Sequence, residues 1–142
     1  MSHSEMLPGE FETLRRLRRY RADRAERALR EAKRLQQALV TDIQQAQDTL
    51  EETRREEARQ CAQLLSEHQG QVVSFQALKY WSLKEQSLSA GTRRDEGQLQ
   101  QLRGQQEQRE AQVGIAQKHA TLCLRQVEKL QELVNLLTQE PI

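Results

Sequence analysis

The side chains that most often bind metals or act as nucleophiles are few and isolated in this chain. Three histidines (His3, His68, His119) and two cysteines (Cys61, Cys123) are spread over 142 residues, without a Cys-x-x-Cys pair, a His-x-x-x-His pair or a Gly-rich phosphate loop. Asp and Glu number 21, but they are scattered along polar segments rather than gathered where a pocket would perturb their pKa values. We therefore predict no catalytic residue, no cofactor, no metal site and no enzymatic activity.

The charged residues that do cluster are arginines near the start of the chain. Between residues 12 and 34, ten basic residues face four acidic ones, an excess of six positive charges. One interpretation is a solvated helix face with weak pairs such as Glu26 with Arg30. The other is a surface for an acidic partner, because Arg18 and Arg21 fall on positions where the apolar pattern described below predicts packing, and a buried guanidinium is costly.

Nucleic acid is the weaker candidate for that partner. Tyr20 is the one aromatic residue among these arginines, no groove-reading motif accompanies them, and the net charge of the whole chain is +1. We predict no nucleic-acid binding.

Aromatic residues gather in the middle of the chain. Phe75, Tyr80 and Trp81 are three of the five aromatic residues, and they lie within seven positions. Trp81 continues the packing pattern described below and would close the end of a hairpin. Phe75 and Tyr80 point away from that pattern, and exposed aromatic anchors are typical of protein-docking surfaces.

The pattern that must position these residues is clearest in the last third of the chain. Twelve positions follow one another in alternating steps of three and four, and ten of them are apolar or Cys, as in the seam of a coiled coil. They are Leu99, Leu102, Gln106, Arg109, Val113, Ala116, Ala120, Cys123, Val127, Leu130, Val134 and Leu137. The same series extends backwards, more weakly, through Asp95, Thr92, Leu88, Glu85, Trp81 and Leu78. Such a stripe predicts a second helix packed against it.

The first arm carries a matching pattern. Neither Pro nor Gly occurs between Glu10 and His68, and a step of four just before Ile43 follows another step of four, a stutter that locally unwinds a supercoil. The predicted seam positions are Phe11, Leu14, Arg18, Arg21, Ala25, Ala28, Ala32, Leu35, Leu39, Ile43, Ala46, Leu50, Thr53, Cys61, Leu65 and His68.

These patterns predict an all-α fold, a long antiparallel two-helix coiled-coil hairpin. Residues 1–9 form a disordered leader that Pro8 and Gly9 end, and residues 10–142 form a single hairpin. Its helices cover about 10–68 and about 74–138, with a turn near 69–73 at Gly70. An alternative turn at residues 87–97, which contain Gly91 and Gly97, would leave very unequal arms.

The hairpin makes predictions about pairing. Leu14 should lie near Leu137, and Cys123 should lie opposite Ala28. Cys61 and Cys123 would then be too far apart for a disulfide, which needs Cα atoms within about 7 Å.

Composition limits the remaining classes. The chain is 36% hydrophobic and 30% charged, its mean hydropathy is −0.89, and it contains no apolar run long enough for a membrane span or a signal-peptide core. We expect a cytoplasmic protein without direct membrane insertion.

In outline the sequence resembles the YscO/FliJ-like family, the central stalk proteins of type III secretion systems. The resemblance rests on the opening LRRLRRYRADRAERAL, the length, the Gln-rich second arm and the Phe75 segment near the break. It implies an antiparallel two-helix coiled coil similar to the stalk of the rotary F1 ATPase. The paired termini would insert into the pore of a hexameric secretion ATPase, and the hairpin tip would face the cytoplasmic ring of the export gate. It also implies contact with secretion chaperones and a peripheral association with the inner-membrane apparatus.

Mapped onto this chain, the resemblance implies two binding regions. The ATPase end is Leu14, Arg15, Arg16, Leu17, Arg18 and Arg19, which we call the basic end. The export-gate end is Phe75, Leu78, Tyr80 and Trp81, which we call the aromatic tip. In flagellar relatives the gate-binding stripe continues from Phe with Leu, Ala and His, whereas this chain offers Lys79, Ser82 and Gln86 at those spacings.

The rival hypothesis is a generic coiled-coil scaffold or chaperone-like adaptor. In that case the seam from Leu99 to Leu137 would be covered by a second copy of the chain instead of by its own first arm.

Overall fold

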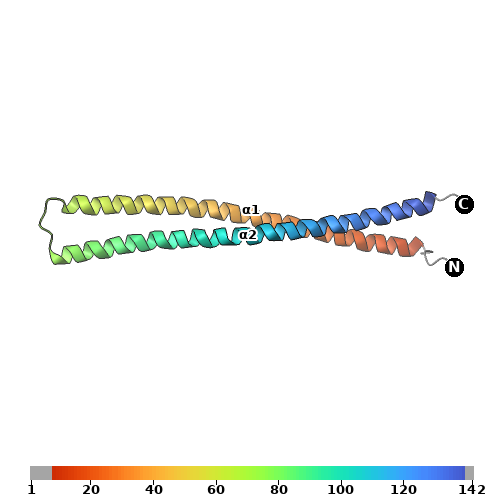
Figure 1. The fold of residues 1–142 in the computed structure, drawn as a ribbon, viewed down its shortest axis with the longest axis horizontal. Helices are drawn as coiled ribbons and strands as arrows, with labels where there is room; N and C mark the ends of the chain where they lie inside the picture. The colour runs from red at the N-terminus through yellow and green to blue at the C-terminus, as the bar shows by residue number, and fades with distance from the viewer. Residues whose placement is uncertain (1–7, 140–142) are drawn as a thin grey trace. The chain divides into compact units, whose positions relative to one another are not determined.

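The computed structural model describes residues 8–139, which form two long α-helices and no strand. Helix α1 spans Pro8–His68 and helix α2 spans Phe75–Gln139. The two run antiparallel from the connecting residues 69–74 (Figure 1). The predicted all-α coiled-coil hairpin is therefore confirmed. The alternative turn at 87–97 is wrong, because those residues lie inside α2.

Helix α1 begins earlier than the sequence pattern indicates. Pro8 and Gly9 belong to the helix, although we had assigned them to the end of a disordered leader. Proline is well suited to a first helical position, because its fixed φ is helical and the N–H it lacks would have no intrahelical partner there. The rest of the predicted leader, residues 1–7, lies outside the described residues.

The connection between the helices is built by one glycine and one serine. Gly70 has φ of 75°, a left-handed conformation that only glycine adopts without strain, and Gln71 N–H donates to the carbonyl of His68 at 3.3 Å. Ser74 then caps α2, since its hydroxyl accepts a hydrogen bond from Ala77 N–H at 3.1 Å. Both helix boundaries thus follow from local side-chain and backbone chemistry.

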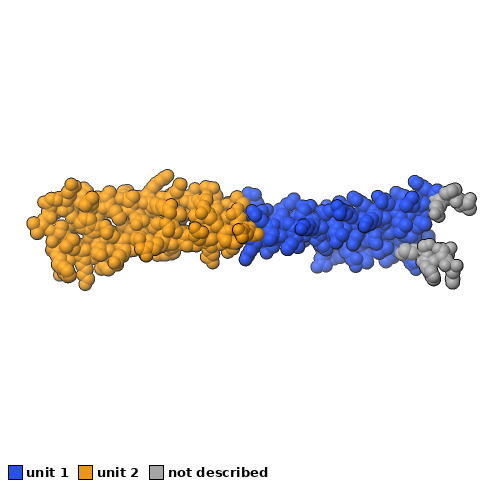
Figure 2. All heavy atoms as spheres, in the orientation of Figure 1, with its two compact units in different colours: residues 1–37, 108–142 blue, residues 38–107 orange. Residues whose placement is uncertain are grey.

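Contacts divide the hairpin into two compact units. Unit 1 comprises residues 1–37 and 108–142, and unit 2 comprises residues 38–107 (Figure 2). Each unit contains a segment of α1 and a segment of α2.

Unit 1 has a core of small residues. Ala22, Ala25, Ala120 and Cys123 are buried together, and two larger side chains, Leu29 and Val127, pack against them. The four buried side chains are small and come from both helices, so the core of unit 1 is thin.

Unit 2 has a core of larger side chains and contains polar interhelical pairs. Leu39, Ile43, Leu50 and Leu99 are buried together, with Ala46 and Leu102 beside them. Further along, the Thr53 hydroxyl donates to Asp95 at 2.6 Å, and the buried Thr92 hydroxyl donates to Glu57. Two polar layers therefore interrupt the apolar seam.

The predicted seam of α2 is confirmed over most of its length. Every predicted position from Leu88 to Val134 is buried or half-buried, whereas Leu137, the last of the series, is exposed. Nearer the connection the prediction is wrong at Glu85 and Leu78, which are exposed, while their neighbours Lys84 and Ala77 are half-buried instead.

The predicted seam of α1 needs three corrections. Ala22, Leu29 and Leu64 lie in the seam, in place of the predicted Arg21, Ala28 and Leu65, which are exposed. Two consecutive steps of four fall at 14–18–22, and the predicted steps of four at 35–39–43 are also present, since Leu35 is half-buried and Leu39 and Ile43 are buried. This shift keeps the Arg21 guanidinium in water, where its charge is solvated.

Observed contacts place the two helices in a register a few residues from the predicted one. Cys123 clusters with Ala22 and Ala25, whereas Ala28 was its predicted neighbour. Thr53 pairs with Asp95, and His68 stacks on Trp81. Both cysteines are free thiols, in agreement with the predicted absence of a disulfide.

Candidate partner-binding sites

The basic end lies where the first turns of α1 face the last turns of α2. The first predicted seam residues of α1 are Phe11 and Leu14, and both are half-buried. A pocket of about 320 Å³ remains between the helix ends. Its lining combines apolar side chains from both helices with the charged Glu12 and Arg15; the residues are Pro8, Phe11, Glu12, Arg15, Val134, Leu137 and Thr138.

Four of the six predicted residues of the basic end are exposed. Arg15, Arg16 and Arg19 project into solvent with Leu17, while Leu14 is half-buried against α2. Arg15 and Arg16 share the carboxylate of Glu12, at 4.0 and 3.4 Å. Such exposed pairs contribute little to stability, so these guanidinium groups remain available to an external anion.

Arg18 differs from its neighbours. Its Nη1 donates to the backbone carbonyl of Gln126 at 2.8 Å, and the side chain is half-buried. It therefore joins α1 to α2 inside unit 1. The sequence placed Arg18 on the seam, but a backbone carbonyl carries no residue-specific signal from which its partner could be predicted.

One pair farther along α1 neutralises part of the basic run. Arg34 donates to Glu31 through Nε at 2.9 Å and Nη2 at 2.6 Å. These hydrogen bonds lower the pKa of the Glu31 carboxyl and raise that of Arg34. Among the described residues, Arg19, Arg21 and Arg24 have no such carboxylate partner.

The aromatic tip contains two kinds of residue. Phe75 is 81% exposed, and Leu78 and Tyr80 are also exposed on the first turns of α2. Phe75 and Leu78, three residues apart, lie on one face of α2, whereas Tyr80 is exposed on another face next to the connection. Val72, fully exposed in the connecting segment, adds to these exposed side chains and was not identified from the sequence.

Trp81 packs inside the tip rather than on that surface. Its ring stacks on His68 of α1 with centroids 5.0 Å apart, and its indole N–H donates to Glu85 at 2.8 Å. His68 Nδ1 in turn lies 2.8 Å from the carbonyl oxygen of Leu64. Of the two interpretations drawn from the sequence, closure of the hairpin fits Trp81, and an exposed surface fits Phe75 and Tyr80.

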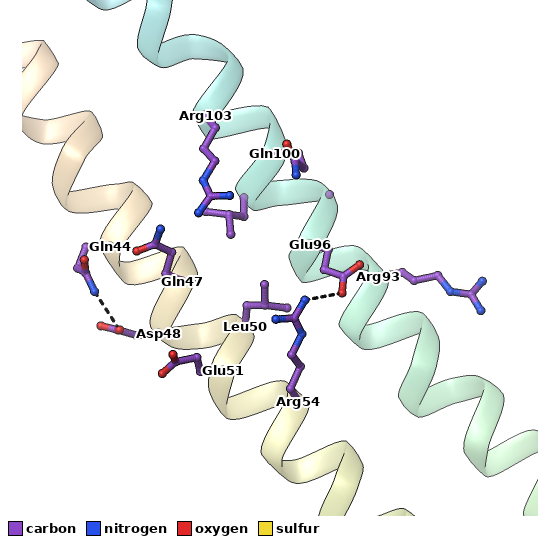
Figure 3. A pocket seen from close by; sticks show the side chains of 12 residues that line it. Gln44, Gln47, Asp48, Leu50, Glu51, Arg54, Arg93, Glu96, Gln100 and Arg103 are labelled. Carbon is purple, nitrogen blue, oxygen red and sulfur yellow. Dashed lines mark hydrogen bonds and ion pairs between the residues drawn. The ribbon is translucent and has the colours of Figure 1, made fainter.

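Unit 2 carries a third concave surface, a groove of about 770 Å³ between the two helices (Figure 3). Leu50 and Leu99 belong to the buried core beneath it, and an ion pair of 2.8 Å between Arg54 and Glu96 crosses it. Its other side chains are of mixed charge: Gln44, Gln47, Asp48, Glu51, Arg93, Gln100 and Arg103, with Gly97. Basic and acidic groups alternate along it, so it lacks the single-sign field that would select one charged ligand.

Neither a metal centre nor a membrane span is found within residues 8–139. No three or more His, Cys, Asp or Glu side chains there are grouped so that they could hold a metal ion. No helix in the same range is apolar over a length that would cross a bilayer.

Comparison with known proteins adds one finding. The model of the family described as "Type III secretion protein YscO" matches residues 11–142, nearly the whole chain. No curated protein and no solved structure matches the chain.

Proposed function

Because this chain belongs to the YscO family of type III secretion proteins, we propose that it is a non-enzymatic central stalk of a type III secretion system. It couples a hexameric secretion ATPase, bound at the basic end, to the cytoplasmic domain of the export gate, bound at the aromatic tip. The stalk is cytoplasmic and associates peripherally with the inner-membrane apparatus, and secretion chaperones are further partners.

The observation that carries this proposal is a hairpin of this family with two unlike exposed surfaces. The basic end offers Arg15, Arg16 and Arg19 to an acidic or carbonyl-lined pore, where charge-assisted hydrogen bonds are strong. The aromatic tip offers Phe75, Leu78 and Tyr80 to an apolar surface. Each is suited to a different partner, as coupling requires.

The basic end is tested with the variant Arg15→Glu/Arg16→Glu/Arg19→Glu. Arg18 is left intact, because its substitution would also break the hydrogen bond to Gln126. We expect stimulation of the cognate ATPase to fall at least tenfold, about 1.4 kcal/mol or more of lost interaction. The matched control is Arg93→Glu/Arg94→Glu/Arg103→Glu, the same charge change on exposed residues of unit 2. Equal stimulation by both variants would refute the assignment of the basic end.

The aromatic tip is tested with Phe75→Ala/Leu78→Ala in a binding assay with the export-gate cytoplasmic domain. Both side chains are exposed, so we expect unchanged helicity and an affinity at least tenfold lower. Leu65→Ala is the control, since Leu65 is an exposed leucine of α1 on the same unit. An affinity equal to that of the unmodified chain would contradict the assignment. Trp81 is unsuitable for this test, because its substitution removes the stacking on His68.

The alternative function, an adaptor that dimerises through its C-terminal heptads, has less support. Its premise is an uncovered seam from Leu99 to Leu137, but Leu99, Ala120 and Cys123 are buried against α1 of the same chain. Sedimentation at increasing concentration separates the two: the stalk stays monomeric, and the adaptor dimerises at micromolar concentration.

A further inference from the structure

A second apolar stripe runs along α2 in unit 1, beside the seam and exposed to solvent. It consists of Ile115, Leu122, Leu133 and Leu136, and we call it the lateral stripe. Their exposed fractions are 70, 54, 47 and 64%. With 3.6 residues per turn, the four side chains lie within about 60° of one another, and their mean direction is roughly 130° from that of the seam. The stripe is therefore a separate surface from the one that α1 covers.

Cationic side chains of α1 border the lateral stripe. A groove of about 410 Å³ brings Arg21 and Arg24 of α1 together with His119 and Cys123 of α2. His119 is four residues after Ile115 and three before Leu122, so it belongs to the same helical row as the stripe. The two arginines consequently lie along the edge of the stripe.

The charge of this edge is not neutralised within the described chain. Arg21 and Arg24 form no ion pair with any residue of 8–139. Lys129, seven residues after Leu122 and seven before Leu136, adds an exposed positive charge within the row itself. The surface thus combines apolar side chains at helical spacing with a positive margin.

We propose that the lateral stripe binds an acidic amphipathic α-helix of a partner protein, which becomes a third helix of unit 1. Apolar residues along one face of that helix, over about five turns, cover Ile115, Leu122 and Leu133, which span about 27 Å. Its Glu and Asp side chains pair with Arg21, Arg24 and Lys129. Two copies of this chain meeting through the same stripe would bring positive margins together, so charge favours the acidic partner over self-association. The proposal is independent of the ATPase and of the export gate.

The probe is a fluorescein-labelled 21-residue helical peptide with Leu at the first and fourth positions of each heptad and Glu flanking them. Its counterpart carries Lys at every Glu position. Fluorescence anisotropy with the full chain measures both affinities at two salt concentrations. We expect the Glu peptide to bind about tenfold tighter than the Lys peptide, with an advantage that shrinks as salt rises.

Variants of the chain assign the binding to the stripe. Leu122→Gln/Leu133→Gln should lower the affinity for the Glu peptide about tenfold. Arg21→Gln/Arg24→Gln should lower this affinity about fivefold and make it less dependent on salt. The control Val40→Gln/Leu65→Gln removes two exposed apolar side chains of α1 in unit 2 and should change the affinity by less than about twofold. Circular dichroism checks that each variant remains helical.

Three results would overturn the proposal. The first is equal binding of the Glu and Lys peptides, and the second is an affinity unaffected by Leu122→Gln/Leu133→Gln. The third is another occupant. A dimer in sedimentation that Leu122→Gln/Leu133→Gln abolishes would assign the stripe to a second copy. Binding to phosphatidylglycerol vesicles that the same variant abolishes would assign it to an anionic lipid surface.

Discussion

At the scale of single residues, neighbouring arginines on one helix have different roles. Arg15 and Arg16 share the exposed Glu12, whereas Arg18 reaches across to a backbone carbonyl of α2. A hydrogen bond from a charged donor to a half-buried carbonyl stabilises a fold more than an exposed ion pair does. The basic run is thus partly structural and partly available to a partner.

This difference predicts unequal effects of two similar substitutions. Arg18→Ala should lower the free energy of unfolding by about 1 kcal/mol, because the carbonyl of Gln126 loses its interhelical donor. Arg16→Ala, at a side chain 80% exposed, should change it by less than about 0.5 kcal/mol. Urea denaturation followed by circular dichroism measures both. Equal effects would mean that the Arg18 hydrogen bond does not join the helices in solution.

A second residue-scale prediction concerns pH. Hydrogen bonds from Arg59, at 3.0 Å through Nε, and from Gln60, at 2.7 Å, lower the pKa of Glu56 to about 2 from 4.5. Since the pKa is depressed in the folded state, the stabilisation is present above about pH 4.5 and is lost as the pH falls toward 2. Carboxyl NMR titration should give the low value, and Arg59→Gln should return it toward 4.5. An unchanged pKa in Arg59→Gln would show that the ion pair is not formed.

At the scale of elements, two glycines differ in whether the backbone needs a glycine: the connection requires one at residue 70, and helix α2 does not require one at residue 104. Gly70 adopts a positive φ, so Gly70→Ala should cost about 1 kcal/mol of stability. Gly104 lies within α2, and a Cβ there would have no heavy atom within 4 Å, so Gly104→Ala should add up to about 1 kcal/mol. Thermal unfolding by circular dichroism compares the two with the unmodified chain. The same sign for both changes would contradict the helix boundaries described above.

The polar layers of unit 2 help to fix the register between α1 and α2. Thr53 with Asp95 and Glu57 with Thr92 each place a hydroxyl donor of one helix opposite a carboxylate of the other. A shift by one heptad would leave these half-buried carboxylates without donors, which costs free energy, whereas an all-apolar seam would tolerate it. The layers therefore favour one antiparallel alignment over its neighbours.

Much of the element structure could be predicted from the sequence, because steps of three and four residues report packing directly. The seam of α2 was correct from Leu88 to Val134, where apolar residues are frequent. In α1 the prediction of Arg21 instead of Ala22 was wrong, because a strict alternation of three- and four-residue steps leads from Arg18 to Arg21, whereas the helix takes two consecutive steps of four there. The lateral stripe was not predicted from the sequence, because polar residues separate its four apolar residues along the same helical row. Partners such as Gln126 for Arg18 depend on register to within a residue, which periodicity alone does not supply.

At the scale of the whole molecule, the question is whether the basic end and the aromatic tip work through one chain. A stalk transmits between partners only when both surfaces belong to the same molecule. Two independent binding functions, in contrast, can be supplied by two different molecules. Chains that each lack one surface distinguish these cases.

The stalk therefore predicts that such chains fail to complement each other. Cells would co-express Arg15→Glu/Arg16→Glu/Arg19→Glu with Phe75→Ala/Leu78→Ala, and secretion of an export substrate would be measured against the unmodified chain. We expect secretion at least tenfold lower, because no single molecule contacts both the ATPase and the gate. Each variant co-expressed with the unmodified chain should secrete, which controls for dominant interference. Restored secretion by the two variants together would show that the ends act separately, and coupling through one hairpin would then be wrong.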